Sequence, residues 1–213
     1  MVKNRKELPL LKVLLAFLVA ILLFSSGLLI GYSVSYFKFQ DIYRSQESIR
    51  YNILSADLEK NFIASCNPDV FSTISSELDE MGNVIDILEE RFGKQDAQVI
   101  EQKKRYTLLE VQHFLTMKDY SKQCSNEINL VIFFYSNSDL YKNQAEKIGY
   151  ILNSIKKDNP DKIMIYSFDY DLDISIMRIL KNVYNVSSPN VVVINEKDKI
   201  TDISNKEEIE KYL

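Results

Sequence analysis

The sequence predicts an α/β domain that follows an apolar N-terminal helix and a helical hairpin. Three observations lead to this prediction. Residues 10–37 are almost entirely apolar, residues 71–120 carry apolar side chains at helical spacing, and residues 129–213 alternate short apolar runs with amphipathic segments. We therefore divide the chain into a cytoplasmic tail (1–9), a transmembrane helix (10–37), a helical stalk and hairpin (38–126) and an α/β domain (127–213).

The apolar segment 10–37 decides the expected compartment. At 1.5 Å per residue this helix is roughly 40 Å long, enough to cross a hydrocarbon core of about 30 Å. The positive-inside rule places the tail in the cytoplasm, because the basic residues near the start of the segment are Lys3, Arg5, Lys6 and Lys12. We expect a single-pass cell-membrane protein with extracytoplasmic residues after 37. A cleaved signal peptide is the alternative, with the small residues Ser25-Ser26-Gly27 as its nearest cleavage site.

Composition and motifs argue against several function classes. A net charge of −4 leaves no general basic surface for nucleic acid. The chain has no glycine-rich phosphate loop and no cluster of residues at metal-ligand spacing, so we expect neither a cofactor nor a metal. The sole histidine, His113, is expected to be a packed or surface residue. Asp169, Asp171 and Asp173 lack the glycine and glutamate of a calcium loop, and we expect them to be a solvated acidic loop.

Residues 40–65 keep a helical period and are expected to extend the membrane helix as a stalk, which Asn67-Pro68 ends. The next helix has a sharp apolar seam: Phe71, Ile74, Leu78, Met81, Ile85, Leu88 and Phe92. Gly93 ends it, and a second helix is expected over about 95–120, with Ile100, Leu108, Val111 and Leu115 on one side and Tyr106, Leu109 and His113 beside them. A short turn between two such helices predicts an antiparallel hairpin. The seam packs either within the chain, as a three-helix bundle with the stalk, or as a coiled coil with a second copy or a partner.

The two cysteines flank this hairpin. Cys66 precedes the outgoing helix and Cys124 follows the returning one, so the hairpin carries both to its open end. In an extracytoplasmic compartment we expect a structural disulfide between them. A redox-active pair and two unpaired thiols are the alternatives.

From residue 129 the pattern changes to buried strands and helices. Strands are expected at 130–135 and 162–168, a third after Pro189 and a short return strand at 200–203. Helices are expected after Asn137 or Ser138, either of which can cap the first, at 174–184, and after a capping box of Ser204 and Glu207. The predicted order is β-α-β-α-β-β-α.

This order resembles the thioredoxin-like superfamily over 129–213. The resemblance rests on FFYSNSDLYK at the first strand-to-helix turn, Asp169 after the second strand, YNVSSP before the third, and KDKITDISNKEEIEKYL at the end. It implies that Pro189 is the family's cis-proline and faces the turn. The family's Cys-x-x-Cys motif is replaced here by Ser138-Asp139-Leu140-Tyr141.

Without a thiolate and a resolving cysteine, this turn cannot exchange disulfides. We therefore expect a non-enzymatic, membrane-anchored module that binds or scaffolds another extracytoplasmic or membrane protein. Its binding surface is predicted at Asn137, Ser138, Asp139, Leu140, Tyr141, Ser188 and Pro189. Two alternatives stay open: a thiol-disulfide oxidoreductase that uses Cys66 and Cys124, and a structural subunit of a membrane complex or a homo-oligomer joined through the stalk.

Overall fold

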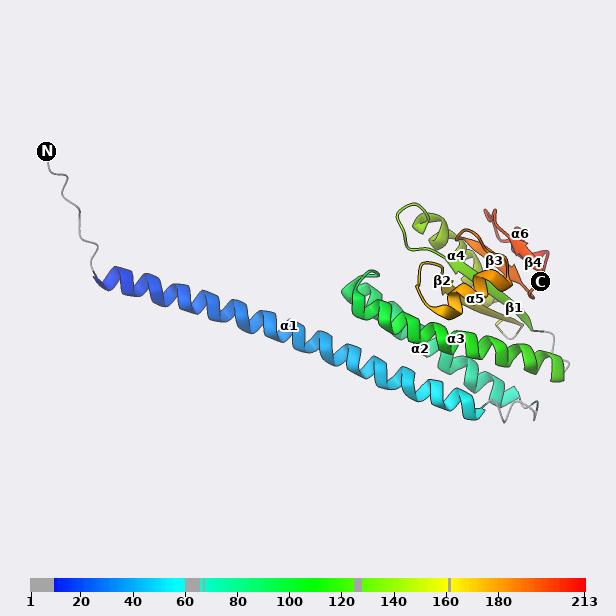
Figure 1. The fold of residues 1–213 in the computed structure, drawn as a ribbon, viewed down its shortest axis with the longest axis horizontal. Coiled ribbons are helices and arrows are strands. Elements are labelled where there is room, and N and C mark those ends of the chain that lie inside the picture. Colours follow the sequence, from blue (N-terminus) through cyan, green and yellow to red (C-terminus); the bar gives the residue numbers. More distant parts are fainter. Residues whose placement is uncertain (1–9, 60–65, 67, 125–127, 161) are drawn as a thin grey trace. The chain divides into compact units, whose positions relative to one another are not determined.

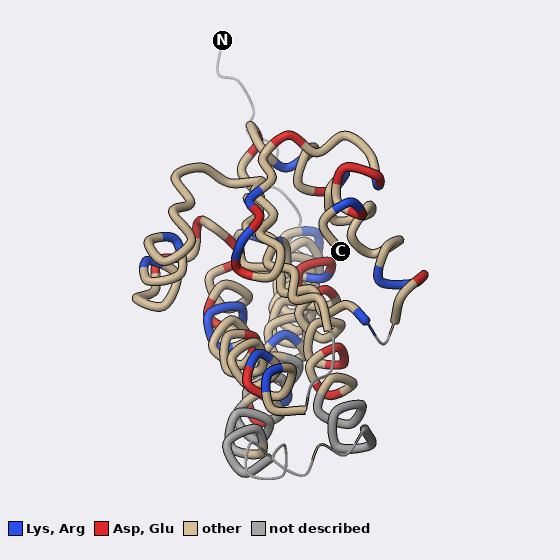
Figure 2. The backbone as a smooth tube through the Cα atoms, turned by 90° about the vertical axis from the view of Figure 1, so that its right-hand side faces the viewer, with Lys and Arg blue, Asp and Glu red and all other residues tan. Residues whose placement is uncertain are grey.

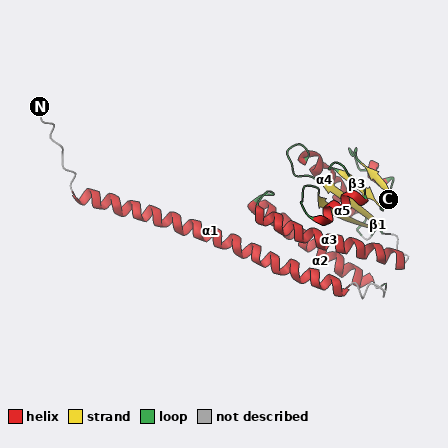
Figure 3. Ribbon diagram, viewed as in Figure 1, coloured by secondary structure: helices red, strands yellow, loops and turns green. Residues whose placement is uncertain are grey.

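The computed structural model describes residues 10–59, 66, 68–124, 128–160 and 162–213. Contacts divide the chain into two compact units, Met1–Arg44 and Ser45–Leu213. Figure 3 shows that the first unit is helical and that the second combines helices with a sheet. The predicted tail 1–9, the residue Asn67 and the boundary at 126/127 lie outside the described residues.

The first unit consists of the N-terminal part of helix α1 (Leu10–Glu59). Its segment Leu10–Arg44 is long and apolar enough to cross a membrane, with a mean hydropathy of 2.8 over its most apolar window. Two serine hydroxyls bond to carbonyl oxygens of their own helix: Ser26 to Leu23 and Ser33 to Leu29, both at 2.8 Å. Such bonds satisfy these two hydroxyls without water, as a lipid environment requires.

Helices α2 (Pro68–Phe92) and α3 (Ala97–Cys124) form the predicted hairpin, shown in Figure 1. Gly93 ends α2 with a positive φ of 93°, which glycine adopts without strain. The Asp96 side chain then starts α3 by accepting hydrogen bonds from the Gln98 and Val99 amides. At the open end, a disulfide joins Cys66 to Cys124 with their Cα atoms 5.5 Å apart, as predicted.

The sheet contains β1 (Asn129–Tyr135), β2 (Ile163–Asp169), β3 (Val191–Ile194) and β4 (Asp198–Ile200) in the order β2-β1-β3-β4. Strands β1 and β2 are parallel, whereas β3 is antiparallel to β1 and to β4. Helices α4 (Lys142–Asp158), α5 (Ser175–Val183) and α6 (Glu207–Glu210) alternate with the strands, so the predicted element order is confirmed.

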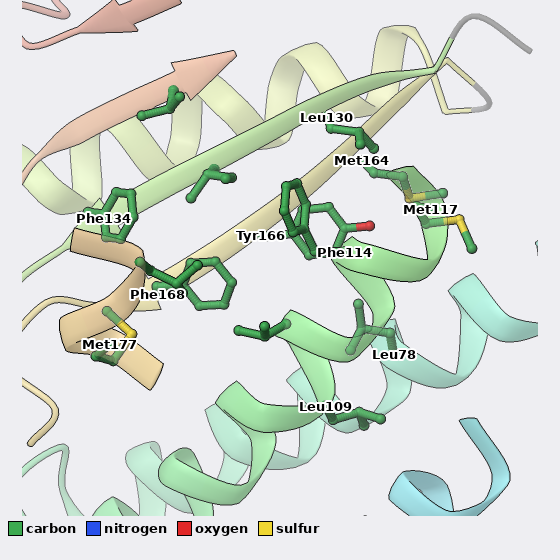
Figure 4. Packing of buried hydrophobic residues seen from close by; sticks show 14 of the residues in the cluster. Leu78, Leu109, Phe114, Met117, Leu130, Phe134, Met164, Tyr166, Phe168 and Met177 are labelled. Atoms are coloured by element: carbon green, nitrogen blue, oxygen red, sulfur yellow. The ribbon is translucent and has the colours of Figure 1, made fainter. Parts of the chain in front are cut away.

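Each face of the sheet has its own core. Side chains from α4 and α6 cover one face, where Val131 and Phe133 point. The hairpin and α5 cover the opposite face, where Ile132 and Phe134 point. Figure 4 shows Phe114 and Met117 of α3 against Leu130, Met164 and Tyr166 of the sheet, with Met177 of α5 beside Phe168. The hairpin is therefore part of the domain's core.

The apolar seam of α2 packs within the chain. Leu78, Met81 and Ile85 are buried in the core that includes α3 and the sheet, and Ile49 of α1 belongs to the same cluster. The surroundings of the Phe71 and Ile74 side chains lie outside the described part of the structure. Of the two arrangements expected from the sequence, packing within the chain is the one adopted by the described seam residues.

The apolar side predicted for α3 is wrong in part. Val111, Leu109 and His113 are buried, but Leu108 and Leu115 are 50% and 52% exposed. Lys103 and Glu110 are buried in their place. The helix turns these polar residues inward because each finds a partner on the sheet.

In the view of Figure 2, acidic and basic positions are interspersed over the described chain.

Two local boundaries also differ from expectation. The return strand is Asp198–Ile200 rather than 200–203, because Asn195 and Glu196 both adopt positive φ and turn the chain early. The predicted box of Ser204 and Glu207 is wrong by one residue. Glu208 accepts from the Ser204 and Asn205 amides, while the Asn205 side chain accepts from the Glu208 amide.

Gly82 on α2 allows the hairpin to pack closely, since a Cβ atom there would lie 3.0 Å from the Tyr106 hydroxyl oxygen. We expect Gly82→Ala to give no net stabilisation in the wild-type chain, because this contact offsets the gain in helix propensity. In a Tyr106→Phe background the same change should stabilise by about 1 kcal/mol. Thermal unfolding of the full chain in detergent measures the coupling. Equal effects in the two backgrounds would show that Tyr106 is not the constraint.

Candidate functional site

The turn after β1 is held by a short chain of hydrogen bonds. The buried Ser136 hydroxyl donates to Asp171 at 2.5 Å and accepts from the Ser138 amide at 3.1 Å. The two serine hydroxyl oxygens are 2.9 Å apart. Because Ser136 donates its only hydroxyl hydrogen to Asp171, the Ser138 hydroxyl must be the donor in the bond between the two serines. The Ser138 hydroxyl is thus engaged within the turn.

The expected side-chain cap of the next helix is therefore wrong. Neither Asn137 nor Ser138 caps α4 with its side chain, and Tyr141 occupies the cap position without a side-chain hydrogen bond. The Ser138 carbonyl instead accepts from the amides of Tyr141 and Lys142, both at 2.9 Å. The chain enters α4 through a backbone turn, while Asp139 pairs with Lys142 at the surface.

The segment before β3 lies against this turn, as predicted. The Asn190 amide donates to the Phe134 carbonyl at 2.6 Å, and its side chain donates to the Tyr141 carbonyl at 3.0 Å. These two bonds place Ser188 and Pro189 beside 137–141. The described chain contains no cis peptide bond, so the expected cis-proline at Pro189 is wrong. Asn190, with φ of 63°, makes the bend that leads into β3.

The seven predicted surface residues differ in exposure. Leu140 is 81% exposed, and Asp139, Ser138 and Ser188 are also exposed. Asn137 is half-buried, and its side-chain oxygen accepts from Lys94, at the closed end of the hairpin, at 3.3 Å. The structure brings all seven together at the C-terminal end of β1. We call these residues the turn surface.

The cysteine pair lies elsewhere. Cys124 ends α3 just before β1 begins, whereas the turn surface follows the last residue of β1. A seven-residue strand is about 23 Å long, so the disulfide and the turn surface lie at opposite ends of β1. The two groups of predicted site residues do not form one site.

A buried charged cluster, which sequence reasoning missed, joins the hairpin to the sheet. Lys103 is 4% exposed, and its amine lies 2.5 Å from Asp169 and 2.8 Å from Glu89. The same amine lies 5.4 Å from the ring centre of Tyr135. Burial opposes the charge, but Tyr135, Asp169 and Glu89 outweigh it and raise the pKa of Lys103. Asp169 is therefore buried and paired, contrary to the expected solvated loop.

Two further buried groups of α3 contact β2. One oxygen of Glu110 accepts from the Ser167 amide at 3.1 Å, which caps the open edge of this strand. Its other oxygen has no hydrogen-bond partner, and burial raises the pKa of Glu110 to about 8. His113 Nδ1 lies 2.9 Å from the Tyr166 hydroxyl, and burial followed by the charge of Lys156 lowers the pKa of His113 to about 4.

The only signal of this cluster in the sequence is spacing. Lys103, Thr107, Glu110, Phe114 and Met117 follow one another at three or four residues, which places them along one stripe of α3. A stripe of polar residues on a helix usually indicates a face exposed to solvent. No feature nearby in the sequence identifies the partners of these side chains. No group of three His, Cys, Asp or Glu side chains among the described residues has the geometry to hold a metal ion.

Comparison with known proteins finds no matching family model, no similar curated protein and no similar solved structure.

Glu110 and His113 predict the pH dependence of stability. A carboxyl group with a raised pKa stabilises the fold fully below its ordinary value of 4.5, and this contribution is lost as pH rises towards 8. His113, with a lowered pKa, acts oppositely between about 4 and 6.5. Of these two groups, only Glu110 therefore changes its contribution to stability between pH 6.5 and 8. We expect stability to fall there by at most about 1.4 kcal/mol per pH unit.

Glu110→Gln should remove most of this fall, because glutamine stays neutral. Thermal unfolding of the full chain at pH 6.5 and 8 measures it. Glu101→Gln is the matched control, since Glu101 is an exposed residue of the same helix. If Glu110→Gln and Glu101→Gln lose stability equally over this range, Glu110 is not the titrating group.

Proposed function

We propose that this protein is a membrane-anchored, extracytoplasmic module with a thioredoxin-like domain that binds another protein through the turn surface. The order of elements after residue 128, the strand order β2-β1-β3-β4 and the contact of the 188–190 segment with the first turn all support a thioredoxin-like domain. A mixed sheet covered by helices on both faces is common to many α/β proteins. The proposal of a thioredoxin-like domain therefore rests on the combination of the three features above.

One observation carries the binding proposal. Two segments about fifty residues apart are fixed against each other by Asn190, and Leu140 projects from them with 81% of its surface exposed. The backbone beneath Leu140 is held by the bonds of Ser136 and Ser138. A rigid surface with an exposed apolar side chain loses little conformational entropy when a partner binds.

The chemistry of the turn also favours recognition over catalysis. The four residues 138–141 contain no thiol, and the Ser138 hydroxyl donates to Ser136 rather than facing a base. Covalent catalysis needs an accessible nucleophile paired with a base, and the hydroxyl that pairs with a carboxylate here, that of Ser136 with Asp171, is fully buried.

Location outside the cytoplasm is supported by two features. The segment Leu10–Arg44 can span a membrane, and basic residues precede its apolar core. The Cys66–Cys124 bridge suits an oxidising compartment. An anchored binding module would present its turn surface to extracytoplasmic or membrane proteins.

A photo-crosslinking amino acid at position 140 tests the binding proposal in native membranes. We expect a covalent adduct of one defined mass at position 140 and none at position 150. Tyr150 is the matched control because it is 76% exposed and lies on α4. Leu140→Asp should weaken recovery of the same partner by about tenfold, whereas Tyr150→Asp should not. Equal adducts at both positions, or none at either, would contradict the proposal.

The second candidate is an oxidoreductase that uses Cys66 and Cys124, and it is favoured by the solvent exposure of Cys66. A structural bridge should resist a glutathione titration, as judged by alkylation and mass spectrometry of the native protein. The double change Cys66→Ser, Cys124→Ser should then lower the free energy of unfolding by about 4 kcal/mol, the chain-entropy value for a closed loop of this size. A pair that cycles under mild reduction would instead support the oxidoreductase.

A further inference from the structure

Between the hairpin and β2 lies a cavity of about 240 Å³ that belongs to neither the turn surface nor the disulfide. Its ionisable lining residues are Asp86 and Glu89 on α2, Lys103, Tyr106 and Glu110 on α3, and Tyr135 on β1. Three carboxyl groups thus face one ammonium group, whose charge is already offset by Asp169 outside the cavity lining. The cavity has an excess of acidic groups.

Glu110 supplies the feature that points to a ligand. Its side chain is 3% exposed, and only one of its two oxygens has a hydrogen-bond partner, the Ser167 amide. A buried carboxylate oxygen without a donor is costly, and Glu110 belongs to the lining of a cavity large enough for a small molecule. When Glu110 is ionised, its missing partner is a hydrogen-bond donor, which a ligand in the cavity could supply.

The cavity wall already accommodates one cation. The Lys103 amine lies near the Tyr135 ring and between two carboxylates, which is the environment that stabilises a desolvated ammonium group. The phenol of Tyr106 lines the same space, and Gly82 leaves room for its hydroxyl. A second aromatic ring and a free carboxyl oxygen thus adjoin the first cation site.

We propose that this cavity binds a small organic cation whose ammonium or guanidinium group donates its N–H hydrogens to the free oxygen of Glu110. A carboxylate and a guanidinium form strong, charge-assisted hydrogen bonds, and the tyrosine rings can stack on a planar cation. The cation is either a free amine or a lysine or arginine side chain of a bound peptide. This site goes beyond the turn surface and does not depend on it.

Cation binding should be coupled to proton release. Burial raises the pKa of Glu110 to about 8, so the group is mostly protonated at pH 7 and must ionise to pair with a cation. The titratable and charged groups around it are Lys103, Tyr106 and His113 on α3, Asp86 and Glu89 on α2, Tyr135 on β1 and Tyr166 on β2. The three tyrosines have raised pKa values and stay neutral. Affinity should therefore rise from pH 6.5 to 8.

Isothermal titration of the full chain in nonionic detergent with agmatine, which carries a guanidinium and an amine, tests the proposal. We expect saturable binding, with release of up to about one proton at pH 7 seen by comparing two buffers of different ionisation enthalpy. Glu110→Gln should weaken binding by at least about tenfold, and Gly82→Ala should weaken it by pushing the Tyr106 ring into the cavity. Glu101→Gln, the exposed control on α3, should bind as the wild type does.

Two comparisons complete the test. A short arginine peptide, acetylated and amidated at its ends, that binds much better than agmatine would assign the cation to a peptide side chain. Butanol, which has a similar chain but no charge, should not bind. The proposal is overturned if the wild type shows no saturable binding of either cation, if butanol binds equally well, or if Glu110→Gln retains full affinity while its unfolding temperature shows that it is folded.

Discussion

The domain depends on covering one face of its sheet with the α2–α3 hairpin. Strand β1 has buried side chains on both faces, so neither face can be left to water. On the face where Ile132 and Phe134 point, α5 has only nine residues and its buried side chains are Met177 and Leu180. The hairpin supplies the rest of that cover through residues such as Phe114 and Met117. Helices that precede the sheet in sequence are thus required for its core.

Charge makes this docking specific. An apolar hairpin face can slide over an apolar sheet at little cost, but Lys103 must meet Asp169 and Glu89 or remain a buried, unpaired cation. Glu110 adds a second fixed point by accepting from the Ser167 amide at the edge of β2. Removing one partner of such a pair is more destabilising than replacing the whole set by apolar residues. We therefore interpret the cluster as setting the register of the hairpin on the sheet, rather than as a large source of stability.

Sequence reasoning succeeded where the pattern is local and failed where the partner is distant. The element order after residue 128 and the pairing of Cys66 with Cys124 follow from periodicity and from hairpin geometry, which need no knowledge of the tertiary fold. The inward face of α3 does not follow in this way. Leu108 and Leu115 appeared to define it but are exposed. Lys103 and Glu110 lie in it among apolar residues, because their partners are on β1, β2 and α2. The cavity was equally unpredictable, because its lining is drawn from four separate elements.

The hairpin also connects the regions that carry the functional proposals. Its open end carries the disulfide, its middle forms the cavity with β2, and Lys94 at its closed end donates to Asn137 of the turn surface. Lys94 also lies 3.8 Å from Glu146 on α4, so the closed end contacts both the turn and the helix that follows it. Asp169 links the cavity to the turn surface, because it pairs with Lys103 and accepts from the side-chain amide nitrogen of Asn137 at 3.5 Å. A partner on the turn surface and a cation near Glu110 would therefore act on the same hairpin. Any shift of α3 on the sheet would change both the turn surface and the cavity.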